Sequence, residues 1–181
     1  MTRIIIEHDE TAESPREWDN LGVMAAFHGR YSLGDKNHGI RHTDYSGWNE
    51  MKADIIRKNP GCVILPLYLY DHSGITMNTT GFSCQWDSGQ VGFIFASAEK
   101  IRECFMVKRI TKKVRERAIA SLVSEVKIYD HYLTGEVYHF RIEGGEHNGE
   151  SCGGFYGSDP FKNGMSDYIP KELHDLLTET I

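Results

Sequence analysis

The stretch that decides the fold is residues 111–135, which read TKKVRERAIASLVSEVKIYDHYLTG. The stretch opens on Thr111, a residue type that caps helix starts, and closes on Gly135, a residue type at which helices stop. Between these two ends, apolar residues recur every three or four positions and would share one helix face: Val114, Ala118, Leu122, Val126, Tyr129 and Leu133. This spacing predicts a long amphipathic helix over about residues 111–133.

Strands and shorter helices are predicted on both sides of this helix. Apolar runs and two-residue alternation predict strands at residues 3–7, 21–27, 62–70, 91–97, 136–142 and 151–156. Helical spacing and end signals predict shorter helices at residues 48–59, 97–106 and 170–177. Strands and helices do not alternate regularly, so we predict an α+β fold with a mainly antiparallel sheet. The length of 181 residues, without repeat or linker, predicts a single domain over residues 1–181.

Pro66 interrupts the predicted strand at residues 62–70. Proline has no backbone N–H to give to a sheet, so we expect either a strand edge or a bulge at this position. An exposed edge would also allow a homodimer, because unpaired strand edges can join a second copy.

Composition excludes several classes of protein. With 40% hydrophobic and 25% charged residues, the chain is neither disordered nor collagen-like. The longest apolar stretch, residues 62–70, is far shorter than the roughly 20 residues that a membrane-spanning helix needs. The N-terminus lacks the apolar core of a secretion signal, so we expect a cytoplasmic protein without membrane contact.

Positive charge gathers just before and at the start of the predicted long helix. Ten residues hold six bases and one acid, while the other 171 residues hold 14 bases and 25 acids. These six bases are predicted to bind nucleic-acid phosphates and are called the basic patch: Lys108, Arg109, Lys112, Lys113, Arg115 and Arg117. A solvated helix face is the alternative interpretation. Bases at a helix start oppose the helix dipole, which favours a role other than helix stability.

Negative charge gathers near the N-terminus. Six acids there could meet a channel lined by Lys and Arg on a partner protein, and they are called the acidic segment: Glu7, Asp9, Glu10, Glu13, Glu17 and Asp19. The alternative is a solvated surface element.

A second polar cluster lies in the predicted loop between residues 28 and 44. It contains imidazoles, carboxylates and a guanidinium, which are the groups of acid/base and hydrolytic metal sites: His28, Arg30, Asp35, His38, His42 and Asp44. A small metal-assisted hydrolase is therefore an alternative function. The spacing matches no established mechanistic motif, and loops also collect polar residues for solubility.

Searches for other chemical motifs find none. The four cysteines are too far apart for a zinc site, and no nucleophile elbow, phosphate-binding loop or dinucleotide fingerprint occurs. We predict no metal, no cofactor and no catalytic residues. Aromatic residues could stack on bases or anchor a partner, although we expect most of them in the core: Trp18, Tyr31, Trp48, Trp86, Phe155 and Tyr156.

Four segments resemble a family of small proteins encoded by bacteriophages and plasmids. They are residues 14–22 (SPREWDNLG), 27–35 (FHGRYSLGD), 110–113 (ITKK) and 126–135 (VKIYDHYLTG), and the similarity runs from about Glu13 to Ile169. Some members of this group look like anti-CRISPR proteins that inhibit type II effectors. The length and acidity of this chain are similar to those of such a Cas9 inhibitor.

The resemblance implies a function by binding rather than by chemistry. It implies an inhibitor of a bacterial defence nuclease, with Cas9 and its guide RNA as partner, direct contact with DNA or RNA, and location in the bacterial host cytoplasm. No residue roles come with the resemblance, so the basic patch and the acidic segment rest on charge alone. A host-takeover adaptor with another protein partner is a further alternative.

Overall fold

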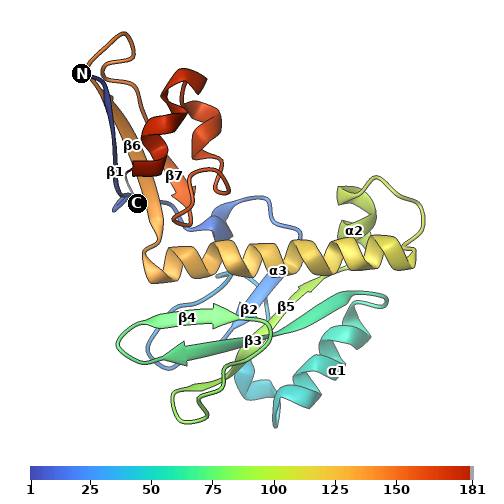
Figure 1. Cartoon of the computed structure of the whole chain (residues 1–181). Helices are drawn as coiled ribbons and strands as arrows, with labels where there is room; N and C mark the ends of the chain where they lie inside the picture. The colour runs from blue at the N-terminus through green and yellow to red at the C-terminus, as the bar shows by residue number, and fades with distance from the viewer. Residues whose placement is uncertain (180–181) are drawn as a thin grey trace. The chain divides into compact units, whose positions relative to one another are not determined.

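The computed structural model describes residues 1–179, and it confirms the α+β fold (Figure 1). The chain forms two compact units: unit 1 comprises residues 1–14 and 131–181, and unit 2 comprises residues 15–130. This division does not decide whether the two units form one domain, so a single domain over residues 1–181 stays a prediction. Among the described residues, no helix has the length and apolar character to cross a membrane.

Unit 1 contains a three-stranded antiparallel sheet in the order β1-β6-β7. The strands are β1 (Arg3–His8), β6 (Val137–Glu143) and β7 (Ser151–Tyr156), close to their predicted positions. The short helices η3 (Met165–Tyr168) and η4 (Lys171–Glu179) contribute to the same core. The predicted C-terminal helix exists, but it is a 3-10 helix. The buried core residues are Ile4, Phe140, Ile142, Phe155, Met165, Ile169 and Leu177.

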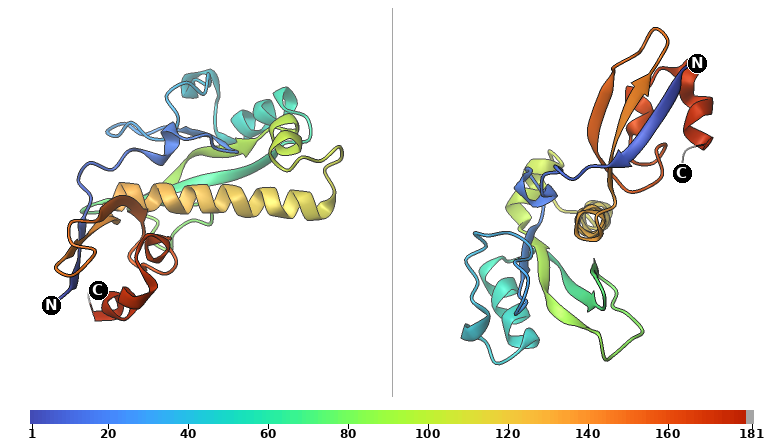
Figure 2. Two further views of the ribbon diagram at one scale, coloured as in Figure 1. Left: turned by 90° about the horizontal axis from the view of Figure 1, so that it is seen from above. Right: turned by 90° about the vertical axis from the view of Figure 1, so that its left-hand side faces the viewer.

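Unit 2 contains a four-stranded antiparallel sheet in the order β2-β5-β3-β4. Its strands are β2 (Val23–Ala26), β3 (Val63–Asp71), β4 (Ile75–Asn78) and β5 (Ser88–Ala96). Helix α1 (Trp48–Lys58) covers one face of this sheet, and α3 (Lys112–Thr134), up to Asp130, lies on the opposite face (Figures 1 and 2). The short 3-10 helices η1 (Pro15–Glu17) and η2 (His42–Asp44) lie on the long connections around β2.

The period of two in β5 explains why both faces of this sheet are covered. Phe93 and Phe95 pack with Met51 and Ile55 of α1, while Ile94, between them, is fully buried on the other face. A side chain added at Gly22 would collide with both Ile94 and Leu122 of α3, which places these residues together. Neighbouring residues on a strand point to opposite faces, so a continuous apolar run suits a sheet with a helix on each side.

The long helix α3 follows its predicted bounds and face. Thr111 caps its start, because the hydroxyl of Thr111 accepts a hydrogen bond from the N–H of Val114 at 3.3 Å. Of the predicted apolar stripe, all but Leu133 are buried, and Leu133 is half-buried. Helix α2 (Ala98–Cys104) begins at the predicted cap Ser97, whose hydroxyl accepts from the N–H of Lys100 at 3.1 Å.

Pro66 lies where the sheet has an edge and close to a bulge, as its chemistry requires. Strand β4 pairs with β3 only from Tyr68 to Asp71, so the stretch around Pro66 pairs with β5 alone. The register with β5 shifts between Leu67 and Tyr68. Because β4 does not pair with this stretch, the missing N–H of Pro66 breaks no hydrogen bond to β4.

A buried arginine connects separate segments of unit 2. The Arg16 side chain is only 4% exposed, and its guanidinium donates to both carboxylate oxygens of Asp35 at 2.7 and 3.1 Å. It also donates to a carboxylate oxygen of Glu125 in α3 at 3.1 Å and to the carbonyl of Gly22 at 2.6 Å. Burial lowers the pKa of Arg16, but Asp35 and Glu125 outweigh this and raise it, so the group stays charged.

The two carboxylates also hold the backbone around β2. Glu125 accepts from the N–H groups of Leu21 and Gly22 at 2.8 and 3.2 Å, and Asp35 accepts from the N–H of Met24 at 2.8 Å. Every charge in this cluster, called the Arg16 cluster (Arg16, Asp35, Glu125), therefore has several partners. In the sequence Asp35 belongs to the candidate acid/base loop, and no local pattern there predicts its pairing with Arg16.

We expect Arg16→Ala to lower the unfolding free energy of unit 2 by about 3–5 kcal/mol, because it leaves two partly buried carboxylates without their cation. Urea denaturation followed by tryptophan fluorescence measures this, since Trp18, Trp48 and Trp86 all lie in unit 2. Arg41→Ala is the matched control, because Arg41 forms an exposed ion pair worth about 1 kcal/mol or less. Equal effects of the two substitutions would contradict the importance of the cluster.

Candidate functional site

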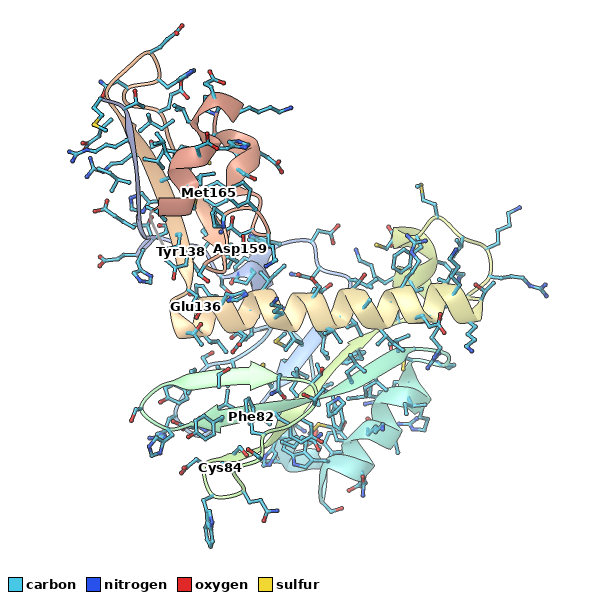
Figure 3. The ribbon with its side chains drawn as sticks, in the orientation of Figure 1. Phe82, Cys84, Glu136, Tyr138, Asp159 and Met165 are labelled. Atoms are coloured by element: carbon cyan, nitrogen blue, oxygen red, sulfur yellow. The ribbon has the colours of Figure 1, made fainter. Side chains whose placement is uncertain are left out.

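Five basic side chains surround a hollow of about 510 Å³ in unit 2. The α1–β3 turn forms one wall through Pro60 and Gly61, and the other walls come from α2, the connection after it and the start of α3. The hollow and its five cations are called the basic hollow: Arg102, Lys108, Arg109, Lys112 and Arg115. The structure thus brings four members of the predicted basic patch together and adds Arg102. Figure 3 shows nitrogen-tipped side chains extending outward around this end of α3.

Two arginines of the basic patch are positioned by specific contacts. The Arg115 guanidinium donates to the carbonyl oxygen of Cys62 at 3.0 Å. The guanidinium carbon of Arg117 lies 4.5 Å from the centroid of the Phe105 ring, within cation–π range. Lys113 and Arg117 do not line the hollow. The predicted six bases therefore divide into four around the hollow and two beside it.

The basic patch carries no carboxylate partners in the part of the chain that the structure describes. None of its six members forms an ion pair there, and all six are exposed. By contrast, Arg3, Arg16, Arg30, Arg41 and Arg57 each pair with a carboxylate. An uncompensated cluster of cations attracts anions over several ångströms, and the positive end of the α3 dipole adds to this field.

In unit 1, two acids of the acidic segment, Glu7 and Asp9, bind partners within the protein. Glu7 lies within ion-pair distance of His139 and Arg141, at 3.6 and 3.5 Å. Asp9 accepts hydrogen bonds from the N–H and hydroxyl of Thr11 and from the N–H of Gly154. Slight burial raises the pKa of Asp9, but these hydrogen bonds outweigh it and lower the pKa. Glu10 lines a surface hollow together with Glu7 and Asp9.

Two of the remaining three acids, Glu17 and Asp19, also pair through their carboxylates, whereas Glu13 contributes its backbone carbonyl. The carbonyl of Glu13 accepts from the Tyr156 hydroxyl at 2.6 Å. In unit 2, Glu17 pairs with Lys36 at 3.1 Å and Asp19 pairs with Lys100 at 2.8 Å. The acidic segment is thus shared between two units, and most of its carboxylates already bind internal partners. The basic hollow is the stronger candidate for an external ligand.

The carboxylates of the histidine-rich loop also serve the fold. Asp35 belongs to the Arg16 cluster, and Asp44 pairs with Arg41 at 3.1 Å. Arg30 pairs with Asp71, and the His28 ring lies 3.6 Å from the same carboxylate. Within residues 1–179, no three His, Cys, Asp or Glu side chains are grouped to hold a metal ion. The structure does bring His28, His38 and His42 to one cavity, where Phe27, Tyr31 and Trp48 add three aromatic rings and Asp35 is the carboxylate of the lining.

Most of the six aromatic residues named from the sequence were expected in the core, but only Phe155 among them is buried. Trp18, Tyr31 and Trp86 are exposed, and Trp86 is 95% accessible. They lie on turns and connections, where no second layer covers them.

No protein-family model, curated protein or solved structure matches this chain.

Two histidines are expected to titrate on opposite sides of the ordinary value of about 6.5. Burial lowers the pKa of His38 despite the opposing effect of Asp35, whereas Glu150 and Glu172 raise the pKa of His147. Because folding favours neutral His38, its contribution to stability is present above pH 6.5 and is lost as the pH falls through the lowered pKa. NMR titration of the imidazole protons measures both values. A His38 pKa at or above that of His147 would contradict the described packing.

Proposed function

We propose that this protein is a non-enzymatic inhibitor of a bacterial defence nuclease, a CRISPR–Cas9 effector. In this proposal it binds the effector, its guide complex or its nucleic acid in a stoichiometric complex. The basic hollow contacts nucleic-acid phosphates, and the bound protein occludes the path that the target strand would take. The proposal has a general part, nucleic-acid binding, and a specific part, the effector as target.

The general part depends on one observation, the gathering of unpaired cations around the basic hollow. A phosphate backbone offers evenly spaced negative charges without sequence information, and Lys and Arg are its usual ligands. The rest of the chain carries excess negative charge. It would repel a polyanion, so one region of the surface is favoured for binding.

The specific part depends on the resemblance of residues 13–169 to proteins of phages and plasmids. Such elements gain from blocking a host nuclease, and an inhibitor that binds needs no catalytic group. The basic hollow supports contact with the guide RNA or the target DNA, both of which the effector handles as polyanions.

Charge reversal at two lysines tests the general part. We expect Lys112→Glu with Lys113→Glu to weaken binding of a single-stranded oligonucleotide at least roughly tenfold and to reduce the salt slope by about two. Both side chains are exposed, and acids near a helix start favour the helix dipole, so folding should be preserved. Fluorescence anisotropy at several salt concentrations measures the effect. Lys52→Glu with Lys127→Glu changes the net charge by the same amount at two exposed lysines outside the hollow; it is the matched control and should change binding little.

If the double variant and the Lys52→Glu, Lys127→Glu control weaken binding equally, net charge rather than the basic hollow determines affinity. If the wild-type protein does not bind the oligonucleotide at low salt, the general part is wrong.

Cleavage of target DNA by Cas9, at fixed effector and guide, tests the specific part. We expect activity to reach its floor at a fixed ratio of one chain, or one dimer, per effector. Loss that is substoichiometric and grows with time would instead indicate an enzyme, and its sensitivity to chelator would test the metal-assisted hydrolase. Unchanged cleavage at large excess would contradict this target while leaving nucleic-acid binding to be judged by the oligonucleotide experiment.

A further inference from the structure

A second cavity in unit 2, of about 540 Å³, has an unusual lining of flat rings. It lies at the histidine-rich loop and shares no lining residue with the basic hollow. Six of its lining side chains are aromatic or imidazole rings, and the cavity is called the ring pocket: Phe27, His28, Tyr31, His38, His42 and Trp48. Its size falls in the range of about 300–1,000 Å³ that small-molecule sites occupy.

The rings of the pocket contact one another in ordered pairs. His28 and Tyr31 are stacked, with centroids 5.0 Å apart and planes inclined by 20°. Phe27 meets His38 edge to face at 5.3 Å and lies 6.5 Å from Trp48. Trp48 in turn packs edge to face on Phe93 of the core at 6.1 Å. One wall of the pocket is therefore fixed to the core, while Tyr31 and His42 on the rim remain exposed.

The loop that carries these rings is held in place from several sides. Asp35 is bound by Arg16, and Leu33 is buried. The N–H of Gly34 donates to the Tyr129 hydroxyl of α3 at 3.0 Å. Gly34 has a positive φ of 71°, and a side chain there would meet the carbonyl oxygen of Met24, so glycine is required. The pocket is thus formed before any ligand arrives.

The imidazoles give the pocket hydrogen-bonding edges. The Nδ1 atom of His38 lies 3.1 Å from the N–H of Ile40, and Nδ1 of His28 lies 3.2 Å from the N–H of Arg30. Where Nδ1 accepts, the ring proton lies on Nε2: Nε2 of His38 can then donate to a ligand, whereas Nε2 of His28 lies 3.6 Å from the Asp71 carboxylate. The ring of His42 makes no hydrogen bond or ion pair among the described residues, so both of its nitrogens are available to a ligand.

The charges around the pocket indicate which planar ligand fits. Asp35 is the lining carboxylate, and it shares the Arg16 guanidinium with Glu125, so this cluster keeps one net negative charge. Lys36 at the rim is 76% exposed and pairs with Glu17 at 3.1 Å, an exposed ion pair that contributes little and that a phosphate can displace. An aromatic cage for a quaternary ammonium gains from a carboxylate that faces the cation, whereas both oxygens of Asp35 already accept hydrogen bonds from Arg16 or Met24. A neutral heterocycle with polar edges matches the pocket, because it can stack on the aromatic rings and hydrogen-bond to the imidazoles. A phosphate attached to the heterocycle matches Lys36 at the rim.

From this arrangement we propose that the ring pocket binds a single nucleobase, either of a free nucleotide or of an unstacked single strand. The base stacks on the exposed rings of Tyr31 and His42, its edge meets the imidazole nitrogens, and Lys36 faces the phosphate. This assignment rests on the ring pocket and stands whether or not the basic hollow binds nucleic acid.

Titration with AMP, GMP, CMP and UMP separately, followed by the fluorescence of Trp48 and by calorimetry, tests the proposal. We expect saturable binding of at least one nucleotide. Tyr31→Ala and His42→Ala should each weaken it roughly tenfold, because stacking on one ring typically contributes a factor of this size. Tyr31→Phe keeps the ring and should retain binding. Trp86→Ala, which removes an exposed ring outside the pocket, is the matched control and should leave affinity unchanged.

A single-stranded oligonucleotide distinguishes the two sources of the base. If the strand is the ligand, Tyr31→Ala weakens it as well, whereas the Lys112→Glu, Lys113→Glu variant weakens the strand and leaves nucleotide binding intact. If only free nucleotides respond to Tyr31→Ala, the pocket serves a nucleotide. The proposal is overturned if no nucleotide binds saturably, if Tyr31→Ala binds like the wild type, or if tetramethylammonium binds in preference to all four nucleotides.

Discussion

The charge cluster of Arg16 with Asp35 and Glu125 is the interaction on which unit 2 depends. Three segments that are distant in sequence supply its charges, and each carboxylate also fixes backbone N–H groups near β2. Through Glu125 the cluster ties α3 to the segment before β2, and through Asp35 it holds the loop of the ring pocket. A buried ion pair adds little to stability by itself, but an unpaired member is costly, so the three charges specify one arrangement of these segments.

Internal pairing also determines which charges remain available to a partner. Acids outnumber bases in the chain, yet the acids of the acidic segment largely bind nearby cations or backbone groups. Among the described residues the bases from Lys108 to Arg117 form no ion pair, although Arg115 donates to the carbonyl of Cys62, and the turn at Pro60 and Gly61 lines the hollow beside them. An acidic protein can therefore present one strongly positive region. This is why we favour the basic hollow over the acidic segment as the surface for nucleic acid.

Local patterns in the sequence predicted most of the fold, whereas long-range contacts escaped it. The apolar stripe of α3 and the helix cap at Ser97 can be predicted from the sequence, because each depends on the spacing of residues within one element. Strand β4 was missed, because its four residues lie in a glycine-rich connection that reads as loop. The basic patch was evident from composition, but Arg102 joins the hollow only because α2 folds beside it. The ring pocket assembles from residues 26–48, and nothing local marks Asp35 as the partner of Arg16 rather than a catalytic acid.

The central claim is that unit 2 binds nucleic acid at the basic hollow. The most direct test is to map backbone amide shifts in ¹H–¹⁵N NMR spectra of the whole chain while a short single-stranded RNA is added. The account predicts saturating shifts concentrated at residues 98–117 and at Pro60's neighbour Gly61, with further shifts around Tyr31 and His42 if a base enters the ring pocket. Shifts confined to unit 1, or none at low salt, would contradict it.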